Sequence, residues 1–89
     1  MYLHLGQNAL VSDKQILGIF DLDQCSTSRR TREYLEKAET EGVVLDLSGE
    51  LPRSFVVCDH PYHRQIVYLS QFSPTTLQRR AEGTERALP

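Results

Sequence analysis

Apolar residues in this chain come in runs no longer than one β-strand, and residues typical of turns separate the runs. The run Phe55–Cys58 falls far below the ~20 residues that a membrane-spanning helix needs. No basic segment followed by an apolar segment opens the chain, so we expect a cytoplasmic protein with no membrane partner.

The chain has 89 residues, which is enough for one small domain only. A domain of this size buries only about 60 to 65% of the surface that its unfolded chain exposes. Its own core is therefore marginal, and we expect it to gain stability by forming a homo-oligomer.

Two segments in the first quarter of the chain have the pattern of β-strands. Residues 1–5 alternate polar and apolar side chains, and the turn residues at 6–8 separate them from the apolar residues 9–11, which predicts a hairpin. Residues 15–22 are apolar on both faces, which predicts a central strand. Gly18 interrupts this strand and indicates a bulge or a close backbone contact.

Three further segments predict strands in the second half. Residues 43–47 and 54–58 flank a turn around Pro52, so we expect residues 43–58 to form a hairpin. Residues 66–70 alternate again and are expected to pair with 54–58.

Two helices are expected between and after these strands. Ser26–Ser28 can cap a helix of about four turns that ends at Gly42. Ser73 and Pro74 form a helix start, and this shorter helix is expected to run to Gly83. The sequence thus predicts an α+β fold with an antiparallel β-sheet, one longer helix and a short C-terminal helix. Residues 1–82 are expected to form the domain, and 83–89 a flexible tail.

Cysteine and histidine offer one possible metal site. The chain has two cysteines, Cys25 and Cys58, which are too few for a disulfide scaffold and are expected to be free thiols. Cys58, His60 and His63 lie within six residues, and a zinc ion would need a fourth ligand from elsewhere, such as Asp59 or Cys25. A metal-dependent enzyme that uses these residues is therefore a third hypothesis, behind the two described below.

Other catalytic patterns are absent from the sequence. Asp21 and Asp23 at a strand end can hold magnesium together with a phosphate, but acids at strand ends are common. The chain contains no G-x-S-x-G motif, no glycine-rich phosphate loop and no paired-carboxylate signature. We therefore expect a protein that is not an enzyme and that needs no cofactor.

Arginine is the most informative residue type in this chain. Ten basic residues stand against twelve acidic ones, a net charge of −2, whereas dedicated DNA-binding domains usually carry a basic excess. Eight of the ten cations are nevertheless arginine, whose planar guanidinium suits phosphate and guanine.

The first arginine cluster lies at the start of the longer helix. Arg29, Arg30 and Arg32 precede glutamates in the second half of that helix, which is the reverse of the order that the helix dipole favours. The structural alternative is a set of surface pairs four residues apart, each worth about 0.3 to 0.5 kcal/mol. These pairs are Arg29–Glu33, Arg32–Glu36 and Glu33–Lys37.

Four other arginines are candidates for DNA binding. Arg79 and Arg80 lie near the end of the last helix, where the dipole also explains them structurally. Arg53 lies at a strand entrance where nothing local requires a cation, and Arg64 lies in a loop marked by Pro61.

Six segments in a fixed order resemble the bacterial extracellular-matrix regulator family, which has a RemA and a RemB branch. The chain looks closest to the RemB branch, over about residues 1–81. The segments are MYLHLG (1–6), ILGIFD (16–21), TREYL (31–35), PRSFVV (52–57), VYLS (67–70) and SPTTLQRRA (73–81).

This resemblance implies a small α+β domain similar to the LytTR DNA-binding fold. It also implies a ring-shaped homo-oligomer that acts on double-stranded DNA in the transcription of biofilm-matrix genes. Arginines on one rim of such a ring repeat around it and present a basic track despite the slightly negative net charge.

One departure from the family pattern concerns the turn before residue 54. The RemA branch carries a pair of arginines there that contact DNA, and Glu50 and Leu51 stand at those positions here, leaving only Arg53. Glu50 repels phosphate. The alternative hypothesis is a ring-forming protein-interaction module without direct DNA binding, in which an exposed Leu51 beside Glu50 contacts a protein partner.

Overall fold

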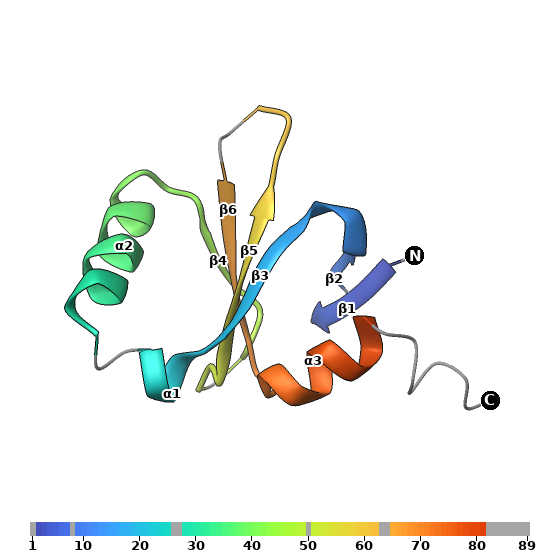
Figure 1. Cartoon of the computed structure of the whole chain (residues 1–89). Coiled ribbons are helices and arrows are strands. Elements are labelled where there is room, and N and C mark those ends of the chain that lie inside the picture. The colour runs from blue at the N-terminus through green and yellow to red at the C-terminus, as the bar shows by residue number, and fades with distance from the viewer. Residues whose placement is uncertain (1, 8, 26–27, 50, 63–64, 82–89) are drawn as a thin grey trace.

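The computed structural model describes residues 2–7, 9–25, 28–49, 51–62 and 65–81, and it confirms the predicted α+β class (Figure 1). The predicted tail lies outside the described residues. The elements are β1 (Tyr2–Gly6), β2 (Ala9–Ser12), a 3₁₀ turn η1 (Asp13–Gln15), β3 (Ile16–Asp21), α1 (Leu22–Cys25), α2 (Arg29–Thr40), β4 (Val44–Asp46), β5 (Ser54–Asp59), β6 (Gln65–Ser70) and α3 (Pro74–Ala81).

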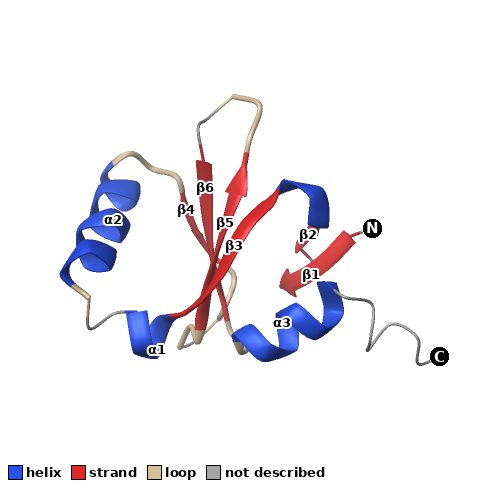
Figure 2. Ribbon diagram, viewed as in Figure 1, coloured by secondary structure: helices blue, strands red, loops and turns tan. Residues whose placement is uncertain are grey.

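Three layers make up the domain (Figure 2). A four-stranded sheet forms the middle layer, and α2 packs on one of its faces. The β1–β2 hairpin and α3 cover the opposite face. The hairpin predicted for residues 1–11 is confirmed as a separate two-stranded antiparallel sheet.

The order of the four strands is β3-β5-β6-β4, which corrects two predictions. The segment 15–22 does not form a central strand, because among the described residues β3 pairs only with β5 and lies at the edge of the sheet. The inner strands are instead β5 and β6, and in β5 the residues from Ser54 to Cys58 are all buried.

Residues 43–58 do not form a hairpin. Both edges of β5 are occupied, one by β3 and the other by β6, so β4 has no place beside it. β4 pairs with β6 in parallel instead, and the sheet is mixed rather than purely antiparallel. The predicted pairing of 54–58 with 66–70 is confirmed.

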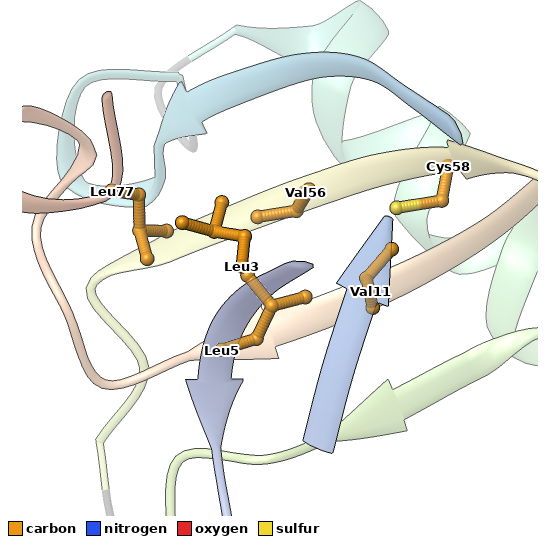
Figure 3. Packing of buried hydrophobic residues seen from close by; sticks show 6 residues of the cluster. All are labelled: Leu3, Leu5, Val11, Val56, Cys58 and Leu77. Carbon is orange, nitrogen blue, oxygen red and sulfur yellow. The ribbon is translucent and has the colours of Figure 1, made fainter. Parts of the chain in front are cut away.

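Successive residues of β5 supply two separate cores, since side chains alternate between the faces of a strand. Phe55 and Val57 pack with residues of α2 on one face. Val56 and Cys58 point to the other face (Figure 3). There they join buried side chains from the hairpin and α3, namely Leu3, Leu5, Val11 and Leu77.

The hairpin is attached to the sheet by its backbone as well as by its leucines. The hydroxyl of Ser70, which is fully buried, donates to the carbonyl of Leu5 at 2.7 Å. Gly6 has a φ of +136°, and a Cβ on it would lie 2.6 Å from the Leu47 carbonyl oxygen. Only glycine allows this close approach of the two backbones.

Both predicted helix starts are confirmed. The Ser28 hydroxyl accepts from the Thr31 N–H at 3.5 Å at the start of α2. Gly42, with a φ of +75°, follows the end of α2. The Ser73 hydroxyl accepts from the Thr76 N–H at 3.2 Å at the start of α3. The short helix α1 was not predicted.

No helix within the described residues is long and apolar enough to cross a membrane.

Candidate nucleic-acid interface

Arg53 combines a firmly held backbone with an exposed side chain. Its N–H donates to the Ser70 carbonyl at 2.8 Å, and its carbonyl accepts from the Leu22 N–H at 3.1 Å. The residue is thus clamped between the end of β6 and α1, just before β5 begins, while its side chain faces solvent. A cation fixed in this way can meet an external anion with little loss of backbone freedom.

A cavity of about 300 Å³ lies beside Arg53. It is lined by Asp21 and Asp23 on one side and by the start of α3, from Ser73 to Thr75, on the other. The Asp21 carboxylate accepts the Asp23 N–H at 2.9 Å, so this acidic pair closes a local turn. The carboxylates also lower the positive potential that Arg53 presents to a phosphate.

The arginines of α2 are all exposed on its first turns. Arg29 Nε lies 3.0 Å from the Glu33 carboxylate, which confirms one of the expected four-spaced pairs. The side chains of this pair are 86% and 61% exposed, so solvent screens the attraction and its contribution to stability is small. Arg30 extends toward β3 and lines a groove between α2 and that strand.

The two arginines of α3 differ from each other. The guanidinium of Arg80 lies 4.4 Å from the centre of the Phe72 ring, and its Nη1 donates to the His4 carbonyl at 3.3 Å. Arg80 therefore links α3 to the β1–β2 hairpin. Arg79, in contrast, is exposed.

The fold gathers some of these candidates at one end of the sheet. β3 and β6 end there, β5 begins there, and α2 begins nearby (Figure 1). Arg53 and the α2 arginines Arg29 and Arg30 therefore share this end. Arg79 and Arg80 lie at the far end of α3, next to the hairpin, and form a separate group.

The turn that departs from the RemA pattern is partly described. Leu51 is 83% exposed, as the protein-interaction hypothesis requires. It borders a cavity of about 530 Å³ that Ser48, Gly49, Gln71 and Phe72 also line. Glu50 and Arg64, two other predicted site residues, lie outside the described residues.

The possible metal ligands are not grouped in the part of the chain that the structure describes, where no three His, Cys, Asp or Glu residues are placed to hold an ion. Cys58 is buried in the core beneath the hairpin, and burial raises the pKa of its thiol to about 11. His60 Nδ1 accepts from the Tyr62 N–H at 3.1 Å. His63 lies outside the described residues.

The groove between α2 and β3 was not predicted from the sequence, because residues 15–22 were expected at the centre of the sheet. Leu17 and Phe20 of β3 line this groove. The interruption at Gly18 was the available signal, since a bulge is typical of an edge strand. The structure confirms this bulge as a register shift between Ile16 and Gly18.

The fold is thus a small α+β domain with arginines exposed on its surface. The chain matches the family model "RemA-like: Extracellular matrix regulatory protein A-like" over residues 2–81. It is 38% identical over 82 residues to Extracellular matrix regulatory protein B of Bacillus subtilis (strain 168). That alignment covers 92% of this chain and 91% of the relative. The chain therefore belongs to the RemA/RemB family, in the RemB branch.

Proposed function

We propose that this chain is a DNA-associated regulator of transcription that acts on biofilm-matrix genes and is not an enzyme. It works in the cytoplasm as a ring-shaped homo-oligomer. Membership of a family named for extracellular matrix regulation supports the regulatory role. The observation that carries DNA contact is Arg53, whose clamped backbone holds an exposed guanidinium at the same end of the sheet as Arg29, the first residue of α2.

Repetition of the Arg53 end of the sheet around a ring supports DNA binding despite the net charge of −2. One copy offers only a few phosphate contacts, and Asp21 and Asp23 weaken the field around Arg53. Several copies on one duplex add their contacts, so a weak site in each copy gives strong binding by the assembly. The contacts expected are to phosphate, which position the protein without reading sequence.

Fluorescence anisotropy of a long labelled duplex tests this proposal at several salt concentrations. We expect saturable binding with a steep salt dependence in the wild type. The double variant Arg29→Ala/Arg53→Ala is expected to reduce the slope of log K against log salt by about 0.9 for each phosphate that it no longer neutralises. An unchanged slope would show that these two arginines are not the site.

Lys14 and Lys37 provide a matched control. Both are exposed, and they lie at the opposite end of the sheet, in the turn before β3 and in the last turn of α2. The variant Lys14→Ala/Lys37→Ala removes the same charge as the arginine pair. We expect it to keep most of the wild-type slope, because a local contact, unlike a net-charge effect, depends on position.

The exposed Leu51 favours a second candidate function, a ring-forming protein-interaction module that never contacts DNA. An 83% exposed leucine at a turn is a typical contact for a protein partner. If the assembled wild type does not bind DNA at low salt, this candidate replaces the first. Affinity capture should then retain proteins on the wild type that Leu51→Asp does not retain, and Leu45→Asp, on another exposed leucine, should retain them.

A further inference from the structure

A groove of about 390 Å³ separates α2 from the outer strand β3. Its exposed apolar side chains are Leu17, Phe20 and Tyr34, which are 58%, 40% and 37% exposed. Phe55 and Val57 of β5 form the floor. Arg30 is the only charged residue among those that line it, within the described part of the chain. The groove is thus a concave, mostly apolar surface at an unpaired sheet edge.

The shape of the groove depends on Phe20. Its ring stacks on Phe55 with 5.0 Å between ring centres. It also lies across Gly18, so closely that a Cβ on Gly18 would be 2.6 Å from the ring. Both contacts hold the ring in one place. The groove therefore offers a preformed surface, which binds a partner with less loss of side-chain entropy than a flexible one.

The outer face of the β1–β2 hairpin is the second exposed apolar surface. Leu3 and Val11 pair across the hairpin and point into the core, so their neighbours point outward. Among these neighbours, Tyr2 is 66% exposed and Leu10 is 62% exposed. The hairpin and the groove lie on opposite sides of the four-stranded sheet (Figure 2).

We propose that the groove of one molecule binds the outer face of the β1–β2 hairpin of a second copy. One surface is concave and the other is the face of a projecting hairpin. The contact covers Tyr2, Leu10, Leu17, Phe20 and Tyr34, which are five of the eight large apolar side chains exposed in the described residues.

Charge also permits this pairing. Among the described residues, those that line the groove include no carboxylate, and the outward residues of the hairpin, Tyr2, His4, Leu10 and Ser12, include no acid and neither Lys nor Arg. The side chains of these two sets therefore bring no like charges together.

The two surfaces are different and face away from each other, so the contact is head-to-tail. Each copy then has one groove and one hairpin to offer, and successive contacts close into a ring if the rotation between copies permits. This inference rests on the proposed function only for its ring, and it is tested without DNA.

Sedimentation velocity over a range of protein concentrations is the test. We expect the wild type to be larger than the 10.2 kDa chain. Leu17→Asp damages only the groove, and Leu10→Asp damages only the hairpin. Each variant alone is expected to be monomeric, and circular dichroism checks that each is folded. Tyr2→Asp is a second hairpin variant should Leu10→Asp fail to fold.

Mixing the two variants distinguishes this contact from others. Leu17→Asp keeps an intact hairpin and Leu10→Asp keeps an intact groove, so an equimolar mixture can form one contact. We expect a mass of two chains and nothing larger. Leu45→Asp carries the same change outside both surfaces and should retain the wild-type mass.

Three results would overturn the proposal. They are a wild type that is monomeric at every concentration, a folded Leu17→Asp that assembles like the wild type, and a mixture that remains monomeric. An assembly that obeys the mixing rule but does not bind DNA would support the contact and refute only the DNA-associated function.

Discussion

The two faces of the four-stranded sheet differ in how completely they are covered. On the face of the β1–β2 hairpin and α3, Leu3, Leu5 and Leu77 have at most 2% of their surface exposed (Figure 3). On the face of α2, a single helix leaves Leu17 and Phe20 partly exposed beside it. The α2 face also buries a core that includes Phe55 and Val67, but beside that core it keeps an apolar surface available for binding.

Leucine truncation on each face gives the largest expected contrast. Leu5→Ala removes a fully buried side chain, and we expect it to lower the free energy of unfolding by about 2 to 5 kcal/mol. Leu17→Ala, at an exposed position, should change it by less than about 0.5 kcal/mol. Urea denaturation at low protein concentration measures both. Equal losses would contradict this difference in burial between the two positions.

The pH dependence of the free energy of unfolding reports on the burial of the Cys58 thiol beneath the hairpin. Burial raises its pKa from 9.0 to about 11, so the unfolded chain loses this proton at lower pH than the folded one. The protonated thiol makes its full contribution to the free energy of unfolding below pH 9, and this contribution is lost as the pH rises toward 11. At 1.36 kcal/mol per pKa unit, the loss is on the order of 2 kcal/mol.

Cys58→Val isolates this effect. It fills the same site without a titrating group, so its free energy of unfolding should fall less than that of the wild type between pH 9 and 11. Burial and Glu41 also raise the pKa of Tyr34, but that residue is common to both proteins and its effect cancels. Burial and Cys58 raise the pKa of Tyr68, so the part of that shift due to Cys58 disappears in the variant together with the thiol. Parallel pH curves for wild type and variant would contradict a buried thiol.

Arg80 gives the smallest of these effects and tests how α3 is joined to the hairpin. Arg80→Ala removes the contact with Phe72 and the hydrogen bond to the His4 carbonyl, and we expect a loss of about 1 kcal/mol. Arg79→Ala is the control, because Arg79 is exposed on the same helix. Thermal unfolding measures the midpoints of both variants, and identical midpoints would show that Arg80 has no structural role.

The sequence predicted most elements, and the reasons are local. Ser28 and Ser73 accept the N–H groups that a helix start leaves unsatisfied, and Gly42 adopts the positive φ typical of a helix end. These interactions join residues only a few positions apart. The position of Arg53 at the start of a strand was predictable for the same reason.

Strand order was not predictable from these signals. The apolar runs in β3 and β5 look alike, and only the pairing of β5 with both β3 and β6 places one at the edge and the other at the centre. The groove follows from this order, since Leu17 and Phe20 line it only because β3 lies at the edge. The second role of Arg80 likewise depends on Phe72 and His4, which are far apart in the chain.

The sequence by itself therefore determined the family, the α+β class, the capped helices and the set of arginines available for binding. The tertiary structure decided which strand is central, which arginines share one end of the sheet and where an apolar groove remains. The physical reason is range. Caps, turns and periodicity act within a few residues, whereas strand pairing and burial depend on which distant segments together remove the most apolar surface from water.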